Sequence, residues 1–105
     1  MIETDLMNLI RLKLTELGYT VFRVNVGTVR LPDGRYFKTG LPTGFSDLFA
    51  IKDGRVCFLE VKVKPNKPTA EQIVFLNQMR IKGCIAGVVY SVEEAVELAR
   101  SLCNG

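Results

Sequence analysis

Residues 45–64 have the sequence FSDLFAIKDGRVCFLEVKVK, in which two apolar segments flank a short polar one. Asp53-Gly54 at the centre of such a pattern is a strong signal for a two-residue turn between antiparallel strands. A turn at this dipeptide fixes which residues of the two strands face each other. The pattern therefore predicts that Asp47 lies directly opposite Glu60.

Two carboxylates in opposed positions need a compensating charge. Directly opposed residues have Cβ atoms about 4.5–5.5 Å apart, and like charges at this separation destabilise a hairpin. A divalent cation between them reverses the sign of the interaction, since Mg²⁺ binds one or two carboxylates together with water and phosphate oxygens. The period of two along a strand places Lys62 on the same face as Glu60. We therefore expect Asp47 and Glu60 to hold a metal ion, with Lys62 beside it.

The alternation of charged and apolar residues around Glu60 has a second interpretation. It is also typical of a strand that turns one face to solvent in an antiparallel sheet. Two features favour a site. Phe45, Phe49 and Phe58 share the face of the carboxylates, and the helix that follows must pack on one side of the sheet. Carboxylates among aromatic rings need a compensating partner.

The rest of the chain predicts an α/β fold of order αβββαβα, with a mixed central sheet flanked by helices. Capping boxes begin two of the helices, Thr69-x-x-Gln72 and Ser91-x-x-Glu94. Strand, helix and strand from 56 to 90 form a βαβ unit, which requires a parallel pair. The expected elements are helix 2–17, strand 19–26, a loop over 27–44 with a short hairpin around Asp33-Gly34, strands 45–51 and 56–64, helix 69–82, strand 84–90 and helix 91–102.

Composition limits the possible chemistry. The 105 residues are 48% hydrophobic and 24% charged, as expected of a single domain over residues 1–105, without a long apolar run for a membrane. Acidic residues near the start argue against a signal peptide, so we expect an intracellular, cytoplasmic protein without a membrane partner.

The absence of His excludes His-based general bases and Ser-His triads. The three Cys residues, 57, 84 and 103, are too far apart for a zinc motif and are expected to be buried and reduced.

Positive charge is concentrated in the middle of a chain whose net charge is +3. Such a concentration is typical of a polyanion-binding surface, although a mixed, solvated surface is the simpler alternative. We expect phosphate contacts from four basic residues: Arg23, Arg30, Arg35 and Lys38. Lys64 and Lys67 are either further phosphate contacts or solvated charges. No recognition helix is evident, so the shape of a nucleic acid, more than its sequence, is expected to select it.

The motif Gly44-Phe45-Ser46-Asp47, followed by Glu60-Val61-Lys62, resembles the G-x-P-D … E-x-K signature of the PD-(D/E)XK nuclease superfamily. Ser46 stands where the signature often has Pro. Over nearly the whole chain the sequence is similar to the stand-alone virus-type replication-repair nuclease family, VRR-Nuc. The resemblance implies a restriction-endonuclease-like core and a catalytic set of Glu3, Asp47, Glu60, Lys62 and Gln72, with the Val61 carbonyl as a further metal ligand.

The outer members of this set each have an alternative role. Glu3 lies in the first turn of the predicted first helix, where a carboxylate also stabilises the helix dipole. Gln72 completes the capping box of Thr69, yet it shares a helix face with Leu76 and Met79, which are expected to pack on the sheet. Gly40 and Gly44 are expected to permit the turns that bring Asp47 into place.

The resemblance also implies a function. It points to a Mg²⁺- or Mn²⁺-dependent endodeoxyribonuclease without a small-molecule cofactor, acting on branched DNA. Cleavage of Holliday (four-way) junctions by a homodimer is the leading hypothesis, which suits a viral or DNA-repair protein. The alternatives are a nicking or flap nuclease of low sequence specificity, an RNA endonuclease related in fold, and a non-catalytic nucleic-acid-binding module.

Overall fold

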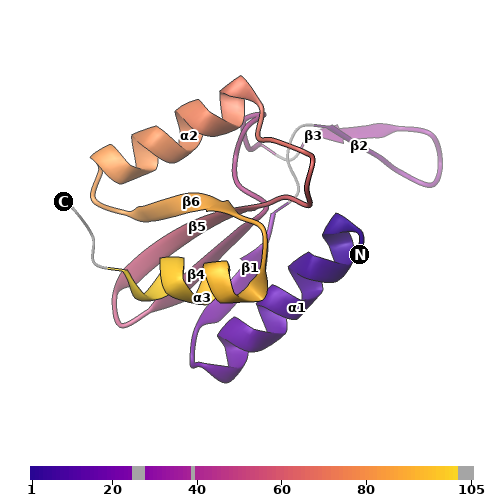
Figure 1. The fold of residues 1–105 in the computed structure, drawn as a ribbon. Coiled ribbons are helices and arrows are strands. Elements are labelled where there is room, and N and C mark those ends of the chain that lie inside the picture. The colour runs from indigo at the N-terminus through magenta and orange to yellow at the C-terminus, as the bar shows by residue number, and fades with distance from the viewer. Residues whose placement is uncertain (25–27, 39, 102–105) are drawn as a thin grey trace.

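The computed structural model describes residues 1–24, 28–38 and 40–101. Within these residues the chain forms three helices and six strands (Figure 1). In chain order they are α1 (Glu3–Glu16), β1 (Thr20–Arg23), β2 (Thr28–Arg30), β3 (Tyr36–Lys38), β4 (Leu48–Lys52), β5 (Arg55–Val61), α2 (Ala70–Ile81), β6 (Ile85–Val89) and α3 (Val92–Arg100).

The central sheet has the strand order β1-β4-β5-β6, antiparallel except for the parallel pair β5-β6. Leu48 pairs with Leu59 and Phe49 with Phe58, which is the register that the Asp53-Gly54 turn predicts. The expected mixed sheet flanked by helices is confirmed. β2 and β3 form a separate two-stranded sheet around the predicted Asp33-Gly34 turn, inserted between β1 and β4.

Several predicted strands are too long. Residues 45–47 precede β4, because Gly44 has a φ of +103° and the hydroxyl of Ser46 donates to the Leu48 carbonyl, which turns the chain before the ladder begins. β5 ends at Val61, since the Asn66 amide donates to the Val63 carbonyl and closes a turn. Lys64 therefore lies beyond the strand. Of the predicted strand 19–26 and helix 91–102, residues 25, 26 and 102 lie outside the described part of the chain.

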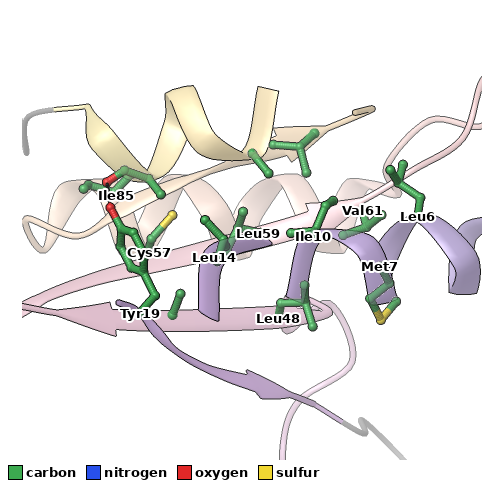
Figure 2. Close-up of a cluster of buried hydrophobic side chains, with 14 residues drawn as sticks. Leu6, Met7, Ile10, Leu14, Tyr19, Leu48, Cys57, Leu59, Val61 and Ile85 are labelled. Atoms are coloured by element: carbon green, nitrogen blue, oxygen red, sulfur yellow. Dashed lines mark hydrogen bonds between the residues drawn. The ribbon is translucent and has the colours of Figure 1, made fainter. Parts of the chain in front are cut away.

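The two faces of the sheet are covered by different helices, as Figure 1 shows. Alternate residues of β5, including Leu59 and Val61, point toward α1 and α3 and form the main core with Ile10 and Leu14 of α1 (Figure 2). The hydroxyl of Tyr19 joins this core to α3 by donating to the Ala99 carbonyl at 3.2 Å. Burial of this one face supplies most of the apolar area that stabilises the fold.

The opposite face of β5 packs against α2 through aromatic rings. Phe75 of α2 lies between Phe45 and Phe58, with ring centroids 4.5 and 5.4 Å away. Phe49 is stacked on Phe22 of β1 at 4.8 Å. The prediction that the three phenylalanines of residues 45–58 share one face is confirmed. This face continues toward Glu60 on β5.

Two further sequence predictions can be compared with the structure. Cys57 is buried as expected, but Cys84 is only partly buried, because it lies just before β6 at the end of α2; Cys103 is outside the described residues. Across the part of the chain that the structure describes, no helix is long and apolar enough to cross a membrane.

Gly44 brings the loop before β4 into contact with α2. A Cβ at this position would lie 2.8 Å from the Glu71 carbonyl oxygen, which is a backbone atom and therefore difficult to displace. Gly40 also has a positive φ, +83°, but a Cβ there would meet nothing within 4 Å. Only glycine combines the conformation and the close approach that position 44 requires.

We expect Gly44→Ala to destabilise the protein more than Gly40→Ala. Both substitutions strain a positive φ, at a cost of about 1 kcal/mol. Gly44→Ala adds a steric clash with the α2 backbone, at a cost of about 1–3 kcal/mol. Urea unfolding of the two variants measures the difference, and equal losses of stability would show that the contact with Glu71 is unimportant.

Candidate functional site

The candidate site lies at the end of the sheet where β4 begins, β5 ends and α2 begins. Asp47 directly precedes β4 and is fixed from two sides. Its backbone carbonyl accepts a hydrogen bond from the Val24 amide at 2.8 Å. Its carboxylate Oδ2 accepts one from the Val61 amide at 2.9 Å. The side chain of Asp47 thus continues the pairing with β5 beyond Leu48, which places it next to Glu60.

The backbone of Val61 is oriented toward Asp47. The next amide along β5, that of Lys62, donates to the Val89 carbonyl and so points toward β6. The N–H and C=O of one strand residue point to the same side, opposite to those of its neighbour. The Val61 carbonyl therefore points to the side of β5 on which Asp47 lies. This direction suits the role of metal ligand that the family resemblance suggests.

Glu60 is fully buried on the α2 face of the sheet. Its Oε1 accepts a hydrogen bond from Nε2 of Gln72 at 2.9 Å and lies 3.7 Å from Nζ of Lys62. Within the described part of the chain, its other oxygen, Oε2, has no hydrogen-bond partner. Such a buried oxygen costs free energy unless a proton or a cation reaches it.

The electrostatics of Asp47 and Glu60 also favour the binding of a proton or a cation. Burial, the largest cause, and the charge of Asp47 together raise the pKa of Glu60 from its ordinary 4.5 to about 8, while Lys62 opposes the shift. A proton on Glu60 lets one carboxyl donate to the other. A divalent cation bound between the two carboxylates also relieves their repulsion, and does so with greater charge than a proton. Cation binding of this kind is the chemistry expected of paired carboxylates.

Gln72 combines the two roles that the sequence left as alternatives. Its Oε1 accepts a hydrogen bond from the Thr69 amide at 2.8 Å, and Thr69 Oγ1 accepts one from the Gln72 amide at 3.2 Å, which completes the capping box. The same side-chain amide then donates to Glu60. The cap at the start of α2 therefore orients the amide group toward the carboxylate.

Glu3 lies in the first turn of α1, and its Oε2 accepts a hydrogen bond from Nδ2 of Asn66 at 3.2 Å. In the described parts of the chain, no group of three or more His, Cys, Asp or Glu side chains is placed to hold a metal ion. The structure thus brings Asp47 and Glu60 together without adding Glu3. Sequence reasoning missed Asn66, a residue of the turn after β5 that carries no motif of its own.

The basic residues expected to contact phosphate have different surroundings. Arg23, Arg30, Lys38 and Lys67 are exposed. Arg35 is held at the tip of the β2-β3 hairpin by Asp33, with Nε 2.6 Å from Oδ2. Lys64 lies over the ring of Tyr90, 5.9 Å from its centroid. Lys62 differs from all of these because its side chain is only 14% exposed and faces Glu60.

The architecture matches that of a solved structure named VRR_NUC domain, with a TM-score of 0.68 over 92% of each chain. The chain has the fold of a VRR_NUC domain. The sequences are 23% identical, and the structural match confirms the fold expected from the sequence motifs. No family model and no curated protein matches the sequence. In this VRR_NUC fold, Asp47, Glu60 and Lys62 meet where two central strands and α2 converge.

A divalent cation fits the donors found at this end of the VRR_NUC fold. Two adjacent carboxylates, one with a buried oxygen that lacks a donor among the described residues, supply the hard oxygen ligands that Mg²⁺ and Mn²⁺ prefer. The Val61 carbonyl lies on the same side of β5. Water and phosphate oxygens normally complete the coordination of such ions.

The raised pKa of Glu60 predicts how stability depends on pH in the metal-free protein. The folded state binds this proton more tightly than the unfolded state, so the contribution of Glu60 to the free energy of unfolding is fully present below pH 4.5 and is lost as the pH rises toward about 8. Denaturant unfolding in EDTA across this range should show a loss of a few kcal/mol that Glu60→Gln lacks. Parallel pH profiles for the two proteins would contradict the assignment.

Proposed function

We propose that this protein is a Mg²⁺- or Mn²⁺-dependent nuclease that hydrolyses phosphodiester bonds in DNA. The observation that carries the proposal is the buried Oε2 of Glu60, without a hydrogen-bond partner among the residues described, beside the carboxylate of Asp47. A purely structural role does not explain why two carboxylates are placed together in an aromatic environment. The fold of a VRR_NUC domain and the nearby Lys62 support the same function.

In the proposed mechanism, Asp47, Glu60 and the Val61 carbonyl hold the cation. When bound, the ion supplies Lewis-acid charge that offsets the negative charge of the scissile phosphate. Lys62 directs its ammonium group toward the phosphate and the attacking water, and stabilises the charge that develops in the transition state. Gln72 keeps Glu60 in one orientation through its hydrogen bond to Oε1.

This site is suited to branched DNA more than to a particular base sequence. Its chemistry recognises phosphate charge, and three exposed cations, Arg23 at the end of β1 and Arg30 and Lys38 on the hairpin, would contact the backbone without reading bases. Symmetric cleavage of a four-way junction requires two such sites, which a two-fold homodimer provides. We therefore propose Holliday-junction cleavage by a homodimer, consistent with a role in DNA repair.

We expect Asp47→Ala and Lys62→Ala each to reduce cleavage by at least a hundredfold, because each removes a group that acts on the reacting phosphate. The assay uses four-way junction, flap, linear duplex and single-stranded DNA, with and without Mg²⁺ or Mn²⁺. Lys82→Ala is the matched control, since Lys82 is an exposed lysine at the opposite end of α2.

The outcomes separate the competing functions. Binding without metal-dependent cleavage of any substrate would favour a non-catalytic module, and cleavage of RNA alone would favour a ribonuclease. Cleavage that survives Asp47→Ala would refute the proposed site. Sedimentation velocity tests the assembly, because a monomer that still makes symmetric cuts in a four-way junction would contradict the homodimer.

Gln72→Glu separates helix capping from the support of Glu60. Glu retains the acceptor for the Thr69 amide, so α2 remains capped, but it loses the donor to Glu60. We expect a roughly 10- to 100-fold loss of cleavage, because the donor to Glu60 is replaced by a carboxylate that repels it. Urea unfolding measured beside cleavage shows how much stability the added charge removes. Thr69→Ala is the converse control. It removes about 1 kcal/mol of capping and leaves the Gln72 amide free to support cleavage at temperatures where α2 is folded. Equal activity of both variants would exclude a role for the Gln72 amide.

A further inference from the structure

The β2-β3 hairpin presents a face on which an aromatic ring lies between basic side chains. Arg30 is paired with Tyr36 and Thr28 with Lys38, so these four residues share one face of the two-stranded sheet. Phe37 points to the other face. Tyr36 is 70% exposed, although a tyrosine ring normally packs against other side chains.

Packing does not account for this exposure. β2 and β3 contact each other, and in the described chain neither packs extensively against a helix or the central sheet. A two-stranded hairpin is only marginally stable by itself, so an exposed ring on it contributes little to folding. The acid nearest in sequence, Asp33, is paired with Arg35 at the turn. The face with Tyr36 is therefore aromatic and positively charged.

The insertion that carries the hairpin leaves and rejoins the central sheet beside the candidate metal site. The chain leaves β1 at Arg23 and returns to β4 at Leu48, and the Val24 amide bonds to the Asp47 carbonyl at the base of the hairpin. Figure 1 shows the hairpin projecting from the end of the sheet at which α1 and α2 begin. A nucleic acid with its scissile phosphate at Asp47 and Glu60 thus passes close to the hairpin.

We propose that the β2-β3 hairpin is a nucleic-acid-binding arm, in which Tyr36 stacks on an unpaired base while Arg30 and Lys38 bind the adjacent phosphates. Aromatic rings combined with cations are the usual means of binding single strands, because every base offers a face for stacking. A fully paired duplex offers no such base. The arm deepens the proposed nuclease function, on which it rests, by specifying a branched substrate in which bases next to the cleaved bond are unpaired, as in a flap, or become unpaired at the branch point of a four-way junction.

The test is binding without cleavage. In EDTA, fluorescence anisotropy compares a forked duplex carrying single-stranded arms with a blunt duplex of the same sequence. We expect Tyr36→Ala to weaken fork binding by about tenfold, which corresponds to the loss of one stacked base, without weakening duplex binding. Tyr36→Phe should restore fork binding. Phe37→Ala, which removes a ring from the opposite face, should leave both affinities unchanged.

Two further measurements complete the experiment. A 2-aminopurine base at the first unpaired position should be quenched by the wild type and by Tyr36→Phe, but not by Tyr36→Ala. Arg30→Gln combined with Lys38→Gln should weaken binding to both DNAs and reduce the salt slope by about 1.8 for contacts on the duplex or about 1.4 for contacts on the single strand, as expected for two lost phosphate contacts.

The arm is refuted if Tyr36→Ala binds the fork as tightly as the wild type, or loses the same affinity for both DNAs. Sedimentation of Tyr36→Ala as a smaller species would show instead that the hairpin binds a second copy of the chain. The nuclease proposal is tested separately, because Asp47→Ala should lose cleavage and keep the preference for the fork. A preference that depends on Tyr36 in a protein without nuclease activity would support the arm and reject the nuclease.

Discussion

The hydrogen bond from the Val61 amide to the Asp47 carboxylate is the interaction on which the site depends. It forms just beyond the last backbone pair of β4 and β5, so a side chain continues the ladder and is held beside Glu60. The surrounding loop is built to permit it. Gly44 approaches the backbone of α2 more closely than any other residue type allows, and Val24 fixes the Asp47 carbonyl. Both contacts act on backbone atoms, which makes the position of the carboxylate rigid.

Placing the Asp47 carboxylate beside Glu60 lowers the free energy of unfolding. The partly buried carboxylate of Asp47 and the buried carboxylate of Glu60 repel each other when both are charged, and Gln72 and Lys62 offset this only at one oxygen of Glu60. The remaining electrostatic cost favours capture of a proton or a divalent cation. The main core lies on the opposite face of the sheet, against α1 and α3, and supplies the stability that the site itself reduces. The main core and the candidate site therefore lie at different places on one sheet, the core on one face and the site at one end.

The site and the hairpin arm share this end of the molecule because of the chain connectivity. The strands of the central sheet converge there with the beginnings of α1 and α2, and the β2-β3 insertion leaves the sheet at the same place. In the proposed nuclease, an insertion at this position would change which nucleic acid reaches the carboxylates without altering the packed layers. In the proposed enzyme, the sheet end supplies the chemistry, and Arg30, Tyr36 and Lys38 supply the selection of substrate.

Sequence alone was sufficient to predict the hairpin register, the face shared by Phe58 and Glu60, and the capping box of Thr69. These features follow from turn chemistry and from a period of two or 3.6, which are local. Of the second predicted box only the Ser91 cap forms, because the Glu94 carboxylate accepts a hydrogen bond from the Tyr90 amide instead. Three features depend on tertiary packing. β4 begins only after Asp47, the Gln72 amide donates to Glu60, and Glu3 accepts a hydrogen bond from Asn66. Tertiary packing also leaves Tyr36 exposed. These contacts depend on how helices and loops distant in the chain pack together, and periodicity carries no information about that packing.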